Sequence, residues 1–377
     1  MLIGIDGNEA NIKERVGVNV WAWEILKKLS ERLPRAAKGS SRNDISVQVY
    51  LSNLPMEDLP KETENWKYRV IGPGKFWTRC RLPFDLYFHK PRPDVLLSLS
   101  HYGPKWSPVP RIVCIMDLSF LKYPEAFKPA VLWQLKNWTR ESVGNAVHII
   151  TISEFNKKEI VREYGYPEEK ITVVYPGVSE MFKGPVRQLA DRTLRGKKYL
   201  LFVGTRQPKK NLDRLIKAFE LVRNKFPEVE LVIAGKTWQQ FASVKFTKLH
   251  DTEVSQTAAG IQYIGFVPDE DLPGLYAGAE ALILPSVYEG FGIPAVEAMS
   301  VGIPVLASNT TSLPEVVADS GILFNPMDVK DIAGKIEMVL SMNKIERQKL
   351  VKKGMIRAER FSWNIAGDKI IEVLYER

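Results

Sequence analysis

The chain has 377 residues, of which 45% are hydrophobic and 26% charged. This length allows two domains with separate cores, and the composition excludes a disordered chain. No apolar run approaches the roughly 20 residues that a membrane-spanning helix needs. Residues 1–6 are expected to form a strand and do not resemble a signal peptide. Cys80 and Cys114 are too few for a disulfide framework or a zinc site, so we expect a cytoplasmic protein.

The formal net charge is +9, and residues 1–190 carry most of the surplus. A basic first half could attract an anionic acceptor, an anionic membrane surface or nucleic acid. Ordinary surface charge that keeps the protein in solution is an equally good explanation.

Residues 1–180 alternate between apolar runs and amphipathic segments. In residues 19–33 the apolar side chains recur at helical spacing. The expected strands of this half are residues 2–6, 47–52, 94–100, 112–117, 148–153 and 171–175. Such alternation predicts a parallel sheet with helices on both faces, whose ligands lie beyond the carboxyl ends of the strands.

Residues 75–93 mix aromatic and basic side chains with prolines. This composition suits a lip that contacts a lipid-linked acceptor or a membrane interface. It also suits a loop packed under the sheet, or single-stranded nucleic acid, although no RNA-binding motif accompanies it.

A polar, basic segment at residues 183–198 is the expected interdomain linker. The next apolar run ends at Gly204 and is followed by Arg206, Lys209 and Lys210, and then by a helix with a clear apolar face from Leu212 onward. A glycine at a strand end followed by cations and a helix start indicates a phosphate site.

The most informative stretch follows the short apolar run 281–284, which is a predicted buried strand. Gly290 and Gly292 allow a tight turn in which backbone amides approach a ligand, and Pro294 suits the first turn of a helix. This order predicts an anion site at a helix N-terminus. Glu289 and Glu297 flank the site, and carboxylates accept hydrogen bonds from sugar hydroxyls. A nucleotide sugar therefore fits, whereas the alternative is a surface turn with two solvated glutamates.

The stretch reads PSVYEGFGIPAVEAMSVGIPVLAS and has the Glu-x7-Glu spacing of Glu289 and Glu297. It resembles the retaining glycosyltransferases of family 4 (glycosyl transferases group 1), which have the GT-B fold. The resemblance implies two doubly wound, Rossmann-like α/β domains that face each other across a cleft. It also implies that Glu289 contacts the donor sugar and that Glu297 holds the ribose. The amides that meet the sugar and the phosphates would be those of Gly290, Phe291, Gly292 and Ile293.

The same resemblance assigns the donor diphosphate to Lys210 and to Arg206, chosen over Lys209, beside Gly204. Residues 261–268 resemble the family segment beside the nucleobase, which gives Phe266 and Val267 a place in the donor site. Gly17 resembles the first glycine of the Gly-x-Gly loop with which family members approach the donor phosphate or the acceptor, which makes it a candidate donor-binding residue. Asn19 stands where the second glycine is usual, and it can adopt some glycine-like conformations or act as a helix cap.

Family members often carry a histidine before the aspartate at the end of the strand 112–117, near the reacting sugar. Here Met116 takes that place, while Asp117 is present and would orient the acceptor or the sugar. His101 follows the neighbouring strand and is the alternative histidine for the acceptor side, although a lone histidine more often has a structural role.

Residues 269–271 contain an Asp-x-Asp string of the kind that holds a metal in other glycosyltransferases. We instead expect its acids to complement a helix dipole, and we expect no metal and no cofactor. The expected domains are 1–182 for the acceptor and 199–360 for the nucleotide sugar. Residues 361–377 would form a last helix that returns to the first domain, as the resemblance implies.

The resemblance predicts a retaining, metal-independent hexosyltransferase. The neighbourhood around residues 148–178 favours mannose, so GDP-mannose is the first choice of donor over a UDP-sugar. The acceptor would be a glycan or a lipid-linked glycan. Peripheral contact of the protein with an anionic membrane is an option, and we expect no binding of nucleic acid. The alternatives are a nucleotide-sugar epimerase on the same fold and a non-catalytic nucleotide-sugar-binding protein. A dinucleotide oxidoreductase is disfavoured because no Gly-x-Gly-x-x-Gly follows any strand.

Overall fold

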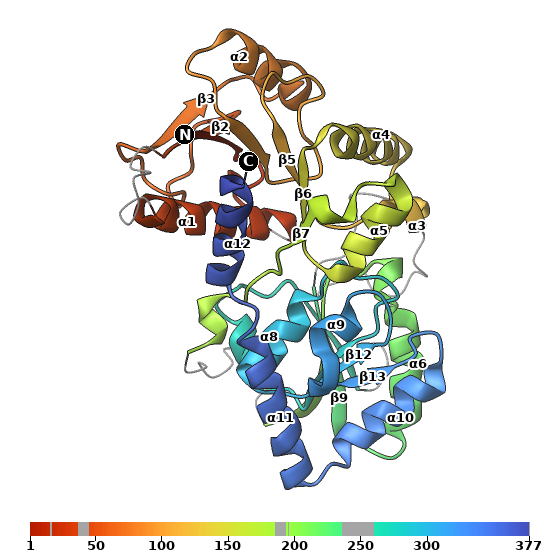
Figure 1. The fold of residues 1–377 in the computed structure, drawn as a ribbon. Coiled ribbons are helices and arrows are strands. Elements are labelled where there is room, and N and C mark those ends of the chain that lie inside the picture. The colour runs from red at the N-terminus through yellow and green to blue at the C-terminus, as the bar shows by residue number, and fades with distance from the viewer. Residues whose placement is uncertain (16, 37–44, 185–193, 195, 236–259, 377) are drawn as a thin grey trace. The chain divides into compact units, whose positions relative to one another are not determined.

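The structure is a computed structural model of the chain. It describes residues 1–15, 17–36, 45–184, 194, 196–235 and 260–376. The chain forms two compact units, drawn as a ribbon in Figure 1. The first unit comprises Met1–Leu118, Ala130–Gly177 and Ser362–Arg377, and the second comprises Ser119–Pro129 and Val178–Phe361.

The first unit contains a seven-stranded parallel sheet in the order β3-β2-β1-β4-β5-β6-β7. Its strands are β1 Leu2–Asp6, β2 Ser46–Leu51, β3 Trp66–Val70, β4 Val95–Ser98, β5 Arg111–Ile115, β6 His148–Thr151 and β7 Ile171–Val173. Its principal helices are α1 Val18–Ala36, α2 Leu82–Phe88, α4 Pro129–Asn145, α5 Glu154–Tyr164 and α12 Trp363–Tyr375. The strand order reverses at β1, which lies between β2 and β4, and this is where ligands bind in open parallel sheets.

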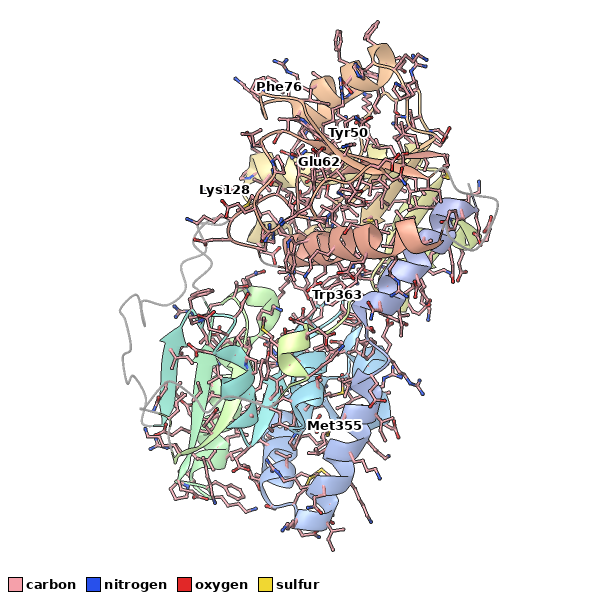
Figure 2. All side chains as sticks on the ribbon, turned by 90° about the vertical axis from the view of Figure 1, so that its left-hand side faces the viewer. Tyr50, Glu62, Phe76, Lys128, Met355 and Trp363 are labelled. Atoms are coloured by element: carbon pink, nitrogen blue, oxygen red, sulfur yellow. The ribbon has the colours of Figure 1, made fainter. Side chains whose placement is uncertain are left out.

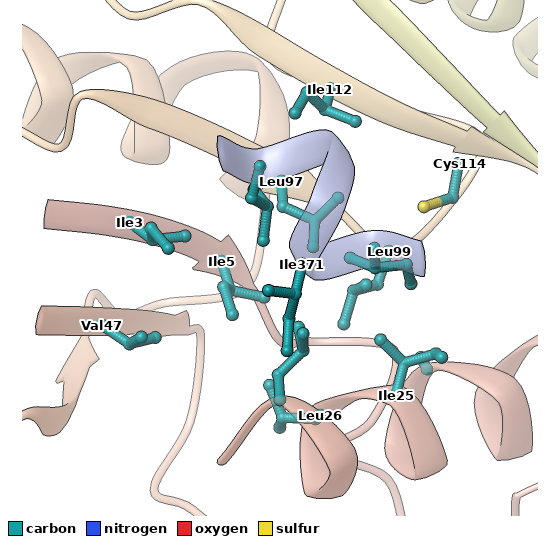
Figure 3. Close-up of a cluster of buried hydrophobic side chains, with 14 of the residues drawn as sticks. Ile3, Ile5, Ile25, Leu26, Val47, Leu97, Leu99, Ile112, Cys114 and Ile371 are labelled. Atoms are coloured by element: carbon teal, nitrogen blue, oxygen red, sulfur yellow. The ribbon is translucent and has the colours of Figure 1, made fainter. Parts of the chain in front are cut away.

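Helices cover both faces of this sheet, because successive side chains of a strand point to opposite faces. On one face, Ile5 and Leu97 pack in the same buried cluster as Leu26 of α1 and Ile371 of α12, as Figure 3 shows. On the other face, Leu96 packs in a separate cluster with the helix α2. The last helix of the chain therefore completes the core of the first unit, beside α1 in Figure 1.

The second unit contains a six-stranded parallel sheet in the order β10-β9-β8-β11-β12-β13. Its strands are β8 Lys198–Val203, β9 Val229–Ala234, β10 Ile261–Gly265, β11 Ala281–Leu284, β12 Val305–Ser308 and β13 Ile322–Phe324. Its helices are α3 Ser119–Lys122, α6 Leu212–Arg223, α7 Leu272–Ala277, α8 Ile293–Val301, α9 Leu313–Val317, α10 Val329–Leu340 and α11 Lys344–Ala358. The order reverses at β8, so the loops after β8 and β11 lie at the switch point of this sheet.

The prediction of two α/β units with parallel sheets is confirmed. Strand β1 ends at Asp6 as predicted, whereas the other five predicted strands of the first unit end one or two residues earlier than predicted, because the residues that follow them belong to loops. The prediction missed β3, an edge strand that pairs only with β2. Lys67 and Arg69 interrupt its apolar residues, and only Trp66 is buried, so it lacks the apolar run by which the buried strands were identified.

The two compact units differ from the predicted domain ranges at residues 119–129 and at the boundaries, where residues 178–182 and Phe361 also cluster with the second unit. Residues 119–129 lie within the predicted first domain but cluster with the second unit. There the Tyr123 ring contacts the Tyr288 ring at 6.0 Å, and Lys209 Nζ lies 3.2 Å from Ser119 Oγ. Most of the expected linker, 183–198, lies outside the described residues.

Across the described ranges, no helix combines the length and the apolar content that a membrane crossing requires.

Candidate functional site

The turn between β11 and α8 has a conformation that only glycine adopts readily. Gly292 has φ +102° and directly precedes the first residue of α8, Ile293. A Cβ at Gly292 would lie 2.6 Å from Leu313 Cδ2, so a larger residue requires the buried Leu313 side chain to shift. Pro294 has no amide proton and the Ala295 amide donates to Gly292 O at 2.9 Å, so an anion at this end of α8 would meet the helix dipole and the backbone of the turn before Pro294.

Hydrogen bonds from the start of α9 fix the shape of this turn. The buried Ser312 hydroxyl lies 2.9 Å from the carbonyl oxygen of Glu289 and 3.0 Å from that of Phe291. The Phe291 ring is buried and packs edge-on against Phe361 at 5.4 Å. The side chain of Phe291 therefore belongs to the core, and only its backbone is available to a ligand.

Glu289 is a buried carboxylate with two side-chain partners. Its Oε1 accepts hydrogen bonds from Lys210 Nζ and from Ser286 Oγ, each at 2.6 Å. The ion pair compensates both charges where solvent reaches little of either side chain. The sequence predicted Glu289 and Lys210 as separate contacts to sugar and phosphate, and the structure brings them together. It adds Ser286, which the sequence analysis missed.

The loop after β8 is tied to the loop after β11. Asn211 is buried and left-handed, with φ +57°, and its Nδ2 donates to Pro285 O at 2.9 Å and to Pro326 O at 2.7 Å. The amide of Val287 donates to Lys209 O at 2.9 Å. These bonds hold the cationic loop beside the glycine turn. The sequence analysis gave Asn211 no role, although Asn adopts the left-handed conformation more readily than most residues.

The two other cationic side chains of this loop take different directions. The Arg206 guanidinium lies over the ring of Tyr263 in β10, 5.4 Å from its centroid. Lys209 Nζ is close to Ser119 and lies 5.9 Å from the centroid of Tyr288. Gly204, with φ +155°, lies against the Lys210 side chain, since a Cβ there would be 3.8 Å from Lys210 Cε.

Glu297 projects from α8 toward α7, where the hydroxyl of Tyr276 donates to its Oε2 at 2.7 Å. Burial raises the pKa of the Glu297 carboxyl to about 7, and the negative charge of Asp269 adds to this shift. Burial likewise raises the pKa of Tyr276 well above its usual value. Glu297 is therefore a carboxyl that can exchange a proton near neutral pH, and its partner Tyr276 gave no sequence signal.

The segment after β10 has an exposed aromatic ring. Phe266 is exposed and Val267 is half-buried. Asp271 immediately precedes α7; its backbone carbonyl accepts from Leu275 N at 3.1 Å, and its side chain makes no capping hydrogen bond to this helix. Within the described part of the chain, no three His, Cys, Asp or Glu side chains gather in an arrangement that could hold a metal ion.

In the first unit, His101 and Asp117 are neighbours at the carboxyl ends of β4 and β5. His101 Nε2 lies 3.1 Å from the carbonyl oxygen of Asp117 and 3.4 Å from its amide nitrogen. Gly17 is exposed, with φ +54°, and a Cβ there would meet open space. The structure thus brings His101 and Asp117 together, while Gly17 stands just before α1.

Asn19 does not cap α1, because the helix already begins at Val18. Its Nδ2 instead donates to Glu9 Oε2 at 2.6 Å. Burial raises the pKa of Glu9, and it raises the pKa of Asp6, at the end of β1, to about 7. These two acids lie at the switch point of the first sheet, and sequence reasoning missed both because they belong to no motif that it used.

Comparisons with known proteins agree with this arrangement. Residues 187–357 match the family described as "Glycosyl transferases group 1", and residues 35–180 match "Glycosyltransferase Family 4". The chain is 35% identical to the O-antigen chain mannosyltransferase B of Escherichia coli over 308 residues, covering 78% of this chain and 76% of that protein. A serotype-specific mannosyltransferase of E. coli, WbdA, is 27% identical over 221 residues. The match covers 57% of this chain and 27% of WbdA, which is the longer protein. Among solved structures, HepE of Anabaena in complex with UDP superposes with a TM-score of 0.70, at 16% identity and with 100% of both chains covered.

Proposed function

The chain is a glycosyltransferase that belongs to family 4 and to the glycosyl transferases group 1, and we propose that it transfers mannose from GDP-mannose to a glycan or lipid-linked acceptor. The relative that is 35% identical over most of the chain is an O-antigen chain mannosyltransferase, and this supports mannose as the sugar. The single observation that carries the site assignment is the contact of Lys210 and Glu289 beside the N-terminus of α8.

The donor diphosphate would occupy the positive end of α8. The amides after Glu289 and the side chains of Arg206 and Lys210 would stabilise the negative charge that grows on the leaving diphosphate. Since these groups supply positive charge and hydrogen-bond donors, we propose that the reaction needs no metal ion.

The carboxylates would hold the sugars. Glu289 would accept hydrogen bonds from the transferred mannose, while Lys210 would turn from Glu289 toward the phosphate. Glu297 would accept hydrogen bonds from the ribose, and Phe266 and Val267 would lie beside the base. Tyr276 and Ser286 keep the two carboxyls in position.

The acceptor would bind at the carboxyl ends of the first sheet, near Asp117 and His101. We propose that the anomeric configuration is retained, with the acceptor hydroxyl attacking from the side of the leaving phosphate, whose oxygen takes up the proton. Asp117 would orient the acceptor or the sugar. We place the reaction in the cytoplasm, and the two free thiols, Cys80 and Cys114, agree with a reducing compartment.

Donor binding is tested by thermal unfolding with GDP-mannose, GDP and UDP-glucose, because a ligand that binds only the folded state raises its stability. We expect stabilisation by GDP-mannose, and its loss in Lys210→Met. Lys225→Met is the matched control, since Lys225 is an exposed lysine of the same unit that pairs with Glu337. Stabilisation by UDP-glucose alone would overturn the choice of donor.

Transfer is tested by GDP release and product analysis with a panel of glycan and lipid-linked acceptors. We expect Glu289→Gln to lower kcat by about 10²- to 10³-fold, the usual effect of removing one preorganised group. Conversion of the donor to another nucleotide sugar without an acceptor would identify an epimerase. If the protein binds the donor but releases no GDP with any acceptor, it is a non-catalytic nucleotide-sugar-binding protein.

A further inference from the structure

The helix α2 of the first unit carries apolar side chains on two opposite faces. Leu82 and Leu86 are buried and pack with Trp77 and Tyr50 in a cluster beneath the helix. The opposite face carries Phe84, Tyr87 and Phe88, which are 66%, 43% and 74% exposed. A surface helix normally has a polar outer face, so this second apolar face requires a partner.

The three exposed rings of α2 lie next to one another. Phe84 and Phe88 have ring centroids 4.7 Å apart, and Tyr87 and Phe88 have theirs 6.5 Å apart. Phe76, which is 65% exposed, precedes the short π-helix Trp77–Arg81 that leads directly into α2. Figure 2 labels Phe76 near the top of the first unit, and Figure 1 shows α2 at the top of the same unit. We call Phe76, Phe84, Tyr87 and Phe88 the aromatic face.

The charges around the aromatic face are positive. Lys75, Arg81 and Lys90 are exposed beside it. The single acid among residues 71–93 is Asp85, which is buried and bound by Arg69 at 2.5 and 2.7 Å. The nearby Glu141 is paired with Arg79 and Lys105. The segment therefore presents cations and aromatic rings to solvent, and no carboxylate of this segment is exposed.

The aromatic face is firmly attached to the sheet. The Arg69–Asp85 pair joins α2 to β3, and the buried side of α2 rests on the cluster that contains Tyr50. Since the helix is fixed from below, its exposed rings cannot turn inward without breaking this core. The exposure is therefore a property of the folded unit.

We propose that the aromatic face docks on an anionic phospholipid membrane. Aromatic rings lie favourably at the level of lipid headgroups, and neighbouring lysines and arginines bind anionic headgroups. The positive charge selects this partner over a second copy of the chain, because two such faces would repel each other. The proposal does not depend on the choice of donor, and it gives the protein a way to meet an acceptor held in a membrane.

Cosedimentation of the full chain with vesicles tests the proposal. Wild-type protein should bind vesicles of phosphatidylcholine with about 30% phosphatidylglycerol, bind pure phosphatidylcholine at least about tenfold more weakly, and be released by salt. Phe84→Ser with Phe88→Ser should weaken binding about tenfold or more. Ile345→Ser with Ile356→Ser is the matched control, because these apolar residues are similarly exposed on α11. It should bind as wild type does.

The contribution of charge is tested separately. Lys75→Glu with Lys90→Glu should abolish the preference for anionic vesicles, whereas Lys349→Glu with Lys352→Glu, two exposed lysines of α11, should not. Thermal unfolding of each variant checks that the fold persists. Failure of the wild type to bind anionic vesicles would overturn the proposal, as would equal loss in the control variants. A dimer that the double Phe variant dissociates would assign the face to a second copy, and tighter binding to single-stranded RNA than to vesicles would assign it to nucleic acid.

Discussion

Lys210 Nζ and Glu289 Oε1 lie 2.6 Å apart and join the loop after β8 to the loop after β11. The pair links two residues that are separated by 79 positions in the chain. Each charge is compensated by the other in a region that solvent barely reaches. The pair is therefore both a structural link and, under the proposed function, the part of the site where sugar and phosphate meet.

This relationship predicts that stability and activity can be separated. Lys210→Met leaves the Glu289 carboxylate without its cation, and we expect the free energy of unfolding to fall by about 2 kcal/mol at neutral pH. Lys210→Met combined with Glu289→Gln removes both charges and should recover most of that loss. Urea unfolding measures the stability, and GDP release should be at least about 10²-fold slower than in the wild type in both variants. A double variant as unstable as Lys210→Met would show that the charge pair is not the cause.

Gly292→Ala tests the glycine turn. The left-handed φ and the 2.6 Å approach to Leu313 Cδ2 both oppose a Cβ, so we expect a loss of about 2 kcal/mol or more and weaker donor binding. Gly334→Ala is the control, since Gly334 is exposed within α10 and a Cβ there meets open space. It should stabilise the protein by up to about 1 kcal/mol, because alanine favours helix. Thermal unfolding of the two variants should therefore shift in opposite directions.

Asn211 predicts a graded series of substitutions. Asn211→Gly keeps the left-handed conformation and loses two hydrogen bonds, for about 1–2 kcal/mol. Asn211→Ala loses the same hydrogen bonds and also disfavours the left-handed backbone conformation. The free energy of unfolding should therefore fall further than in Asn211→Gly. Asn211→Asp places a carboxylate against two carbonyl oxygens and should be the least stable of the three. Equal stabilities in urea unfolding would contradict the assigned role of the amide.

The pKa of Glu297 predicts how stability depends on pH. Its pKa rises from 4.5 to about 7 on folding, so the folded protein keeps a proton that the unfolded chain releases between these values. The free energy of unfolding should therefore fall as pH rises from 4.5 to 7, with the penalty complete above pH 7. Glu297→Gln should be more stable than wild type at pH 8, by about 3 kcal/mol at most, and equal to it near pH 4.5. Unfolding curves at the two pH values measure this difference.

The same carboxyl links donor binding to proton release. Ribose hydroxyls that donate to Glu297 favour its ionised form, so donor binding near pH 7 should release a proton. Calorimetry of GDP-mannose binding in two buffers with different heats of ionisation measures the number of protons released. Glu297→Gln should release none at this site.

The sequence predicted most of the architecture and the outline of the site. Strands such as β8 and β11 are continuous apolar runs, which is typical of strands buried on both faces. The glycine turn could be predicted because Gly290, Gly292 and Pro294, in this order, are typical of a tight turn that leads into a helix. The edge strand β3 was missed because exposure on one side removes the apolar run.

The partners of the site residues were harder to predict, because they depend on tertiary contacts. Tyr276 reaches Glu297 from another helix, and Asn211 reaches Pro326 across 115 positions. Nothing local marks these pairs. Ser286, only three positions before Glu289, was within reach of sequence reasoning but belongs to no familiar motif.

The helix α12 has a consequence for how the protein is made. It supplies Ile370 and Leu374 to the core of the first unit, yet a ribosome synthesises it only after the whole second unit. The nascent first unit must wait with part of its apolar interior uncovered until this late segment arrives, and such a state is prone to aggregate. Truncation before Trp363 should therefore damage the half of the protein that is translated first, and leave the half that lies next to the cut in sequence comparatively intact.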